Sequence, residues 1–77
     1  MSQTQKTIRT IIDGAGGAAA IVTASEAVGL KLGIDAIYKW RHNGIPDRYW
    51  SLIMPIANVS EADLFAANEL ARAEKAA

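Results

Sequence analysis

The segment TASEAVGLKLGIDAIYKWRH, residues 23–42, carries the clearest structural pattern of this 77-residue chain. Its apolar residues recur every three or four positions on either side of a segment that contains two glycines. Such spacing gathers apolar side chains on one face of a helix. The stretch therefore predicts two short helices joined by a tight turn.

A twenty-residue frame for such a helix pair puts Lys31, its ninth residue, at the turn. Ala27 then occupies the fifth position, where the two helices come closest and only a small side chain fits. The positions that the frame buries all fall on apolar residues, namely Leu30, Leu32, Ile37 and Trp40. The outward positions of the second helix hold Asp35, Tyr38 and Lys39.

The turn is the least typical part of this frame. Glycine is usual there because the backbone needs a positive φ, and a lysine at that angle costs on the order of 1 kcal/mol. Gly29 and Gly33 stand on either side of Lys31. A turn displaced by two residues is therefore the alternative.

The same stretch, with its continuation AIYKWRHNGIPDRYW at residues 36–50, resembles the Cro-like helix-turn-helix regulators of phages and prophages. The resemblance covers roughly residues 8–67. It implies an all-α fold of the lambda repressor and Cro type, a compact bundle of about five short helices. It also implies a transcriptional regulator, expected to be a repressor, that binds double-stranded DNA and needs no cofactor.

Helical patterns also fill the N-terminal part of the chain. Ile8, Ile11 and Ile12, within Thr7–Asp13, share one face of a predicted helix that we expect to begin near Thr4. The glycine-rich run at residues 14–17 ends that helix, because glycine makes helix continuation entropically costly. The next two helices are predicted over residues 18–30 and 34–42, with Asn43-Gly44 as the stop of the second.

Two further helices are predicted after this stop. Pro46 suits the first turn of a fourth helix, and Pro55 is expected to end or kink it. Ser60 and Asp63 have the spacing of a capping box at the start of a fifth helix. We therefore expect a single domain over residues 1–77 with a helical C-terminal tail.

Composition agrees with a small regulator. The net charge is zero, but residues 31–48 carry four Lys or Arg against two Asp, and residues 61–75 carry four acidic residues against two basic ones. A weakly basic region opposite an acidic tail suits a protein that contacts DNA on one side only, with strongly salt-dependent binding. Because the hydrophobic 51% includes 15 alanines, the core is thin, and oligomerisation is the expected remedy.

The resemblance implies that the second helix of the pair enters the major groove. Five residues at its start and on its outward face are expected to reach base edges: Gly33, Ile34, Asp35, Tyr38 and Lys39. Lys39 can donate to guanine and Asp35 can accept from cytosine N4. Six residues around them are expected to contact phosphates: Thr23, Ser25, Lys31, Arg41, His42 and Arg48.

Each of these interpretations has a simpler competitor. Lys39 and Arg41 could be ordinary solvated surface charges. Asp35 suits the first turn of a helix through the helix dipole alone. Tyr38 could pack against the helix that carries Trp50 instead of DNA.

One helix reads only a few base pairs, so specificity in this class comes from a two-fold dimer. Three apolar residues of the C-terminal part are the candidate interface: Leu64, Phe65 and Leu70. The alternative is a dimer through the fourth helix, by way of Tyr49, Trp50 and Ile53. The sequence does not decide between the two.

Other classes of function have less support. Without cysteine, and with His42 as the only histidine, the sequence predicts no metal site and no enzyme. Residues 14–19 carry the outline of a dinucleotide-binding turn, but the helices that follow leave too little sheet to cover a cofactor. No run of about 20 apolar residues predicts a membrane span, and we expect a cytoplasmic protein. The runner-up is a small helical interaction module or antitoxin-like partner.

Overall fold

The computed structural model describes the backbone of residues 6–76 and the side chains of residues 6–73. All regular elements in that range are helical, and they are α1 (Ile8–Gly14), α2 (Ala18–Ala27), α3 (Ile34–Asn43), the 3₁₀ helix η1 (Asp47–Tyr49), α4 (Trp50–Ala57) and α5 (Glu61–Ala76). The prediction of an all-α bundle of five short helices is confirmed. None of the helices so described is long and apolar enough to span a bilayer.

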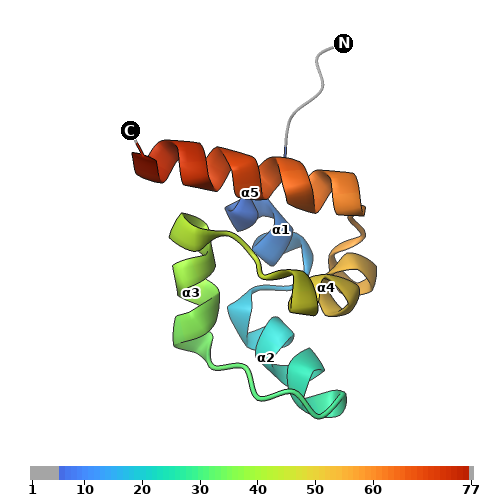
Figure 1. Ribbon diagram of the computed structural model, residues 1–77. Coiled ribbons are helices and arrows are strands. Elements are labelled where there is room, and N and C mark those ends of the chain that lie inside the picture. Colours follow the sequence, from blue (N-terminus) through green and yellow to red (C-terminus); the bar gives the residue numbers. More distant parts are fainter. Residues whose placement is uncertain (1–5, 77) are drawn as a thin grey trace.

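The helices surround α1, which packs against all four of the other α-helices. In Figure 1, α5 lies across the top of the molecule, α3 and α4 stand on opposite sides below it, and α2 closes the bottom. The C-terminal end of α3 therefore meets α5, and its N-terminal end lies near α2. One side of α3 faces the bundle and the other faces outward.

The core is built mainly from isoleucine, contributed by every α-helix except α5. Six of its side chains are almost completely buried: Ile11, Ile21, Ile37, Ile45, Ile53 and Leu64. Trp40 joins them, as the sequence predicts, and so does Leu32. Because α3 buries Ile37 and Trp40 against the other helices, the orientation of its outer face is fixed.

Two helices begin with reciprocal caps. At the start of α5, the Asp63 amide donates to Ser60 Oγ at 3.2 Å and the Ser60 amide donates to Asp63 Oδ2 at 3.0 Å, so the predicted capping box is confirmed. At α1, Thr7 is the cap, since its side chain accepts from the Thr10 amide, so the helix begins at Ile8 and the predicted start near Thr4 is wrong. Each cap satisfies amide groups that the first turn leaves without partners.

The predicted end of α2 at Leu30 is wrong, because α2 ends at Ala27. Gly29 adopts a φ of +80°, its amide donates to the Glu26 carbonyl, and the Leu30 amide donates to the Ser25 carbonyl at 2.8 Å. These two bonds form a Schellman motif with glycine in the left-handed position. The turn therefore lies at Gly29, two residues before Lys31, and the alternative with a displaced turn is confirmed.

This displacement also corrects two buried positions of the frame. Ala27, the last residue of α2, is exposed, and Leu30, which lies beyond the end of the helix, is 36% exposed. The small residue that α2 buries completely is Ser25, two positions earlier. The connection from α2 to α3, residues 28–33, has six residues and is longer than the predicted tight turn.

The connection after α3 follows the prediction more closely. Gly44, with a φ of +87°, ends α3 directly after Asn43. The fourth helix does not begin at Pro46, since the short helix η1 comes first and α4 starts at Trp50. It does not end at Pro55 either, because α4 runs two residues further to Ala57.

Candidate nucleic-acid interface

The outward face of α3 exposes the residues that were expected to reach base edges. Gly33, Ile34, Asp35, Tyr38 and Lys39 are all exposed. Positions 34 and 38, and positions 35 and 39, are each one helical turn apart and lie on neighbouring lines of the same face. The structure therefore brings all five together on one continuous surface.

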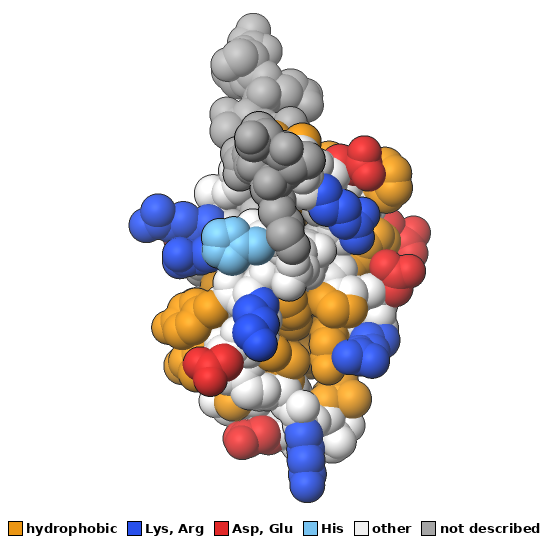
Figure 2. All heavy atoms as spheres, turned by 60° about the vertical axis from the view of Figure 1, so that its left-hand side comes forward, with side chains coloured by type: hydrophobic (Ala, Val, Ile, Leu, Met, Phe, Trp, Pro, Cys, Tyr) orange, Lys and Arg blue, Asp and Glu red, His pale blue; other side chains and the backbone are white. Residues whose placement is uncertain are grey.

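Figure 2 looks onto the side of the molecule that α3 occupies in Figure 1. Lys and Arg side chains are spread from top to bottom of this view, and the acidic side chains lie towards its edges. Exposed apolar side chains fill the space between them. Mixed cationic and apolar surfaces of this kind suit contacts with both phosphates and base edges.

Two of the competing interpretations can be judged from the geometry. Tyr38 is 51% exposed and its ring lies 6.0 Å from the guanidinium carbon of Arg41, so the alternative in which it packs against α4 is wrong. It is Tyr49 that packs inward, with its ring 5.6 Å from that of Trp40. Asp35 lies in the first turn of α3, where the helix dipole favours it, but no side chain makes a capping hydrogen bond there.

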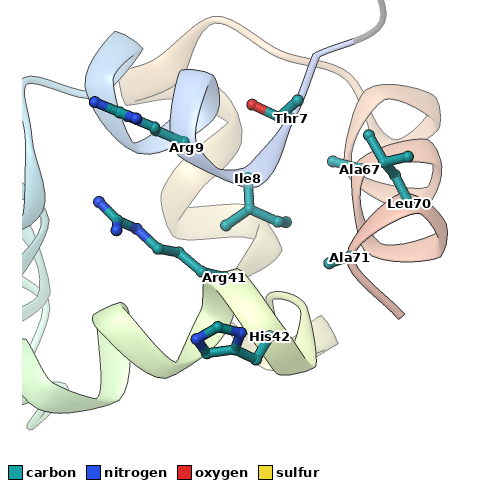
Figure 3. Close-up of a pocket in the computed structure, with 8 residues that line it drawn as sticks. All are labelled: Thr7, Ile8, Arg9, Arg41, His42, Ala67, Leu70 and Ala71. Atoms are coloured by element: carbon teal, nitrogen blue, oxygen red, sulfur yellow. The ribbon is translucent and has the colours of Figure 1, made fainter. Parts of the chain in front are cut away.

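A cationic hollow of about 420 Å³ opens on one flank of α3, between α1, α3 and α5. Its floor is apolar and consists of Ile8, Ala67, Leu70 and Ala71. Thr7, Arg9, Arg41 and His42 line the rest. In Figure 3 the side chains of Arg9 and Arg41 extend in the same direction, away from α5.

A second cationic hollow, of about 440 Å³, lies on the opposite flank of α3. Its cations are Lys39 from α3, Arg48 from η1 and Arg72 from α5, and Asp47 also lines it. The guanidinium of Arg48 rests 5.1 Å from the ring centre of Tyr49. Together the two hollows are lined by five of the eight Lys and Arg residues of the sequence.

A buried amide clamp holds the C-terminal end of α3 against α5. The Ile45 amide donates to Asn68 Oδ1 at 2.8 Å, and Asn68 Nδ2 donates to the Ile45 carbonyl at 3.0 Å. The same carbonyl accepts from Trp50 Nε1 at 2.8 Å. Gly44 fits beside this clamp, since a Cβ there would lie 2.9 Å from Asn68 Oδ1. The clamp anchors the chain where it leaves α3.

The predicted phosphate contacts divide into two groups. Lys31, Arg41, His42 and Arg48 are exposed, as that role requires. Ser25 is completely buried and its hydroxyl donates to the Val22 carbonyl at 2.7 Å, so its prediction as a phosphate contact is wrong. Thr23 is exposed, but its hydroxyl is already hydrogen-bonded to the Ala19 carbonyl at 3.1 Å.

The predicted dimer contacts also need correction. Leu64 and Ile53 are fully buried core residues, so neither can contact a second subunit. Leu70 is half-buried in the floor of the first hollow, and only Phe65 is freely exposed, at 60%. Tyr49 and Trp50 are half-buried. The Tyr49 ring packs against Trp40, and Trp50 Nε1 donates to the Ile45 carbonyl.

An apolar groove of about 400 Å³ between α2 and α4 was not predicted. Val28, 62% exposed, Leu30 and Ile56 are its most exposed large side chains. The misplaced turn concealed it, because the frame assigned Leu30 to the interior. The clamp residue Asn68 and the hollow residue Arg9 were missed as well, because both act across contacts that are remote in sequence.

The described residues contain no cluster of three or more His, Asp or Glu that could hold a metal ion. No protein-family model, curated protein or solved structure matches this chain. Any functional conclusion therefore depends on the surfaces themselves.

Proposed function

We propose that this protein is a double-stranded DNA-binding transcriptional regulator of the Cro-like type that uses α3 as its recognition helix. The observation that carries the proposal is the two-sided character of α3. Ile37 and Trp40 fix one side in the core, and the other side exposes polar, cationic and apolar groups between two cationic hollows. A helix with this distribution of groups suits the major groove, which is about 12 Å wide and has a phosphate backbone along each edge.

The outer face of α3 offers each kind of base contact. Lys39 donates to guanine O6 or N7, and Asp35 accepts from cytosine N4. The ring of Tyr38 and the side chain of Ile34 pack on thymine methyl groups. Gly33, directly before the helix, lets the backbone approach the duplex closely.

Cations on the flanks of α3 supply the sequence-independent part of binding. Arg41 and His42 face one phosphate backbone, and Arg48 faces the other. Lys31 extends the contact beyond the N-terminal end of the helix. Because each neutralised phosphate releases counterions, affinity falls steeply as salt is raised.

Specificity requires a second copy of the chain, because one recognition helix reads only a few base pairs. Two-fold symmetric binding needs half-sites about 34 Å apart, or a multiple of that distance. Among the described residues outside α3, exposed large apolar side chains occur at Phe65 on α5 and along the α2–α4 groove, and either surface could make the contact. Sedimentation of Phe65→Ser and Val28→Ser variants identifies which of them the dimer uses.

The proposal is tested by a gel shift with DNA fragments from around the protein's own gene, since small repressors commonly bind their own promoter. Lys39→Ala should cost about 1 to 3 kcal/mol on the specific site and relax preference at one base pair. Arg41→Ala should weaken specific and random DNA alike and flatten the salt dependence by about one unit of slope. Lys39→Arg and Arg41→Lys, which keep the charge, are the matched controls.

Two results would contradict the proposal or part of it. If no fragment is shifted at low salt and high protein concentration, the protein does not bind DNA and the proposal is wrong. Equal losses on specific and random DNA for Lys39→Ala would remove base reading by that side chain.

The second candidate is a protein-interaction module, which the apolar groove favours. The described residues that line this groove carry no charge, and an apolar groove between two helices can hold the apolar face of an amphipathic helix. A partner helix would perturb the amide signals of Val28, Leu30 and Ile56 and leave those of α3 unchanged. DNA would do the reverse.

A further inference from the structure

Arg9 is the one cation of the first hollow that lies outside the helix pair α2–α3. It comes from α1, 32 positions before Arg41 in the sequence, yet both side chains line the same hollow. Figure 3 shows the two extending side by side, with the imidazole of His42 below them. The described residues that line this hollow include no acidic side chain.

The packing of α1 explains why Arg9 reaches this position. Ile8, Ile11 and Ile12 are buried, so the remaining positions of the short helix face outward. Arg9 is therefore held beside α3 by the core contacts of its neighbour Ile8. The guanidinium of Arg41 lies 6.0 Å from the centre of the Tyr38 ring, and this cation–π contact helps to position the Arg41 side chain.

Two guanidinium groups that line one hollow without a carboxylate form a site that attracts anions. The two guanidinium groups repel each other at short range, and a bound anion offsets this repulsion because it attracts both of them. Arginine suits phosphate in particular, because its planar fork of donors matches two phosphate oxygens. The hollow is open to solvent on the flank of α3, where a duplex lying against the outer face would run its backbone.

We infer that the hollow lined by Arg9, Arg41 and His42 binds one phosphate of the DNA backbone, with Arg9 and Arg41 donating to the same phosphate group. The inference rests on the proposed function and extends the contact surface to α1. Arg9 acts on affinity alone, because a phosphate carries no sequence information.

The test measures the affinity of the full-length protein for a duplex that it shifts in a gel, and for a random duplex, as salt is varied. Arg9→Gln should lower affinity for both duplexes by the same factor, roughly tenfold at low salt, and reduce the salt slope by about 0.9. Arg9→Lys should keep the slope, because it keeps the charge. Unchanged thermal unfolding of both variants shows that α1 stays folded.

A double substitution tests whether one phosphate is shared. If Arg9 and Arg41 hold the same group, Arg9→Gln combined with Arg41→Gln should lose less affinity than the product of the two single losses. Losses that multiply fully would place the two side chains on separate phosphates and overturn the shared site.

The outcomes separate this inference from the proposed function. If the wild-type protein binds DNA and Arg9→Gln leaves affinity and salt slope unchanged, the hollow is not a phosphate site and the function of α3 stands. If the wild-type protein binds no duplex, the proposed function fails, and this inference fails with it.

Discussion

The two connections that flank α3 differ in how they are held. After α3, the chain at Gly44 and Ile45 is buried, and Asn68 and Trp50 hydrogen-bond to the Ile45 backbone. Before α3, residues 28–33 are exposed except for Leu32, and no Cβ added at Gly29 or Gly33 would meet another atom within 4 Å. One end of the proposed recognition helix is anchored by polar contacts, and the other by a single apolar side chain.

The difference shows which part of α3 is fixed by the fold. Side-chain hydrogen bonds to buried backbone groups hold the C-terminal end, beside the two cationic hollows. The N-terminal end, which carries Gly33, Ile34 and Asp35, is supported mainly by Leu32. Under the proposed function, Arg41 and His42 would meet phosphates from the firmly held end of α3, and Gly33, Ile34 and Asp35 would meet bases from the end that is held by fewer contacts.

The largest effect is expected at the anchored connection, for Asn68→Ala. The substitution leaves the buried Ile45 amide without a partner and opens a cavity, so the free energy of unfolding should fall by about 3 kcal/mol. Denaturant unfolding measures the loss. Glu69→Ala, at the exposed neighbouring position, is the control and should change stability by less than about 0.5 kcal/mol. A loss as small in Asn68→Ala would show that the clamp contributes little.

Gly44→Ala should be the next most damaging change, at about 2 kcal/mol. An alanine there has to adopt a φ near +87°, and its Cβ would lie 2.9 Å from the side chain of Asn68. Thermal unfolding is a sufficient measurement. In the double variant with Asn68→Ala, the new Cβ no longer meets the Asn68 amide group, so the loss of stability should be smaller than the sum of the two single losses. Strictly additive losses would show that this contact does not contribute.

Gly29→Ala should cost about 1 kcal/mol, roughly half as much, although its φ of +80° is almost the same. The reason is that nothing lies within 4 Å of the added Cβ, so only the backbone strain remains. Measured beside Gly44→Ala by the same method, this pair separates strain from contact. Equal losses at the two glycines would mean that the two connections are held alike.

The smallest effect is expected for Ala27→Leu, which should change the free energy of unfolding by less than about 0.5 kcal/mol. In the twenty-residue frame with its turn at Lys31, the same substitution would overpack the helix crossing and cost about 1 to 3 kcal/mol. Calorimetry of this one variant distinguishes the two registers. A large loss would restore Lys31 as the turn.

The two connections also explain what the sequence could and could not predict. Helical spacing was enough to place Ile37 and Trp40 in the core and to stop α3 at Gly44, because these features depend on neighbours along the chain. The turn after α2 failed because either glycine beside Lys31 could end a helix. Only the hydrogen bonds to the carbonyls of Ser25 and Glu26 single out Gly29.

Contacts between remote residues were beyond the sequence. An asparagine within a helix is typical of a solvent-exposed position, and its bond to a backbone 23 positions away leaves no periodic signal. In the sequence, Arg9 is likewise only an outward-facing cation of a short helix, and its place beside Arg41 follows from the packing of α1 against α3. The exposure of Asp35, Tyr38 and Lys39 was predicted correctly, because they lie opposite the buried face that the spacing of Ile37 and Trp40 specifies.

Contact between DNA and the outer face of α3 can be observed through the amide chemical shifts of the ¹⁵N-labelled protein, titrated with a duplex that it retards in a gel. We expect the largest changes at residues 33–42, a second set at Arg9, and little change in α4. Changes confined to Val28, Leu30 and Ile56, with the signals of α3 unmoved, would contradict it.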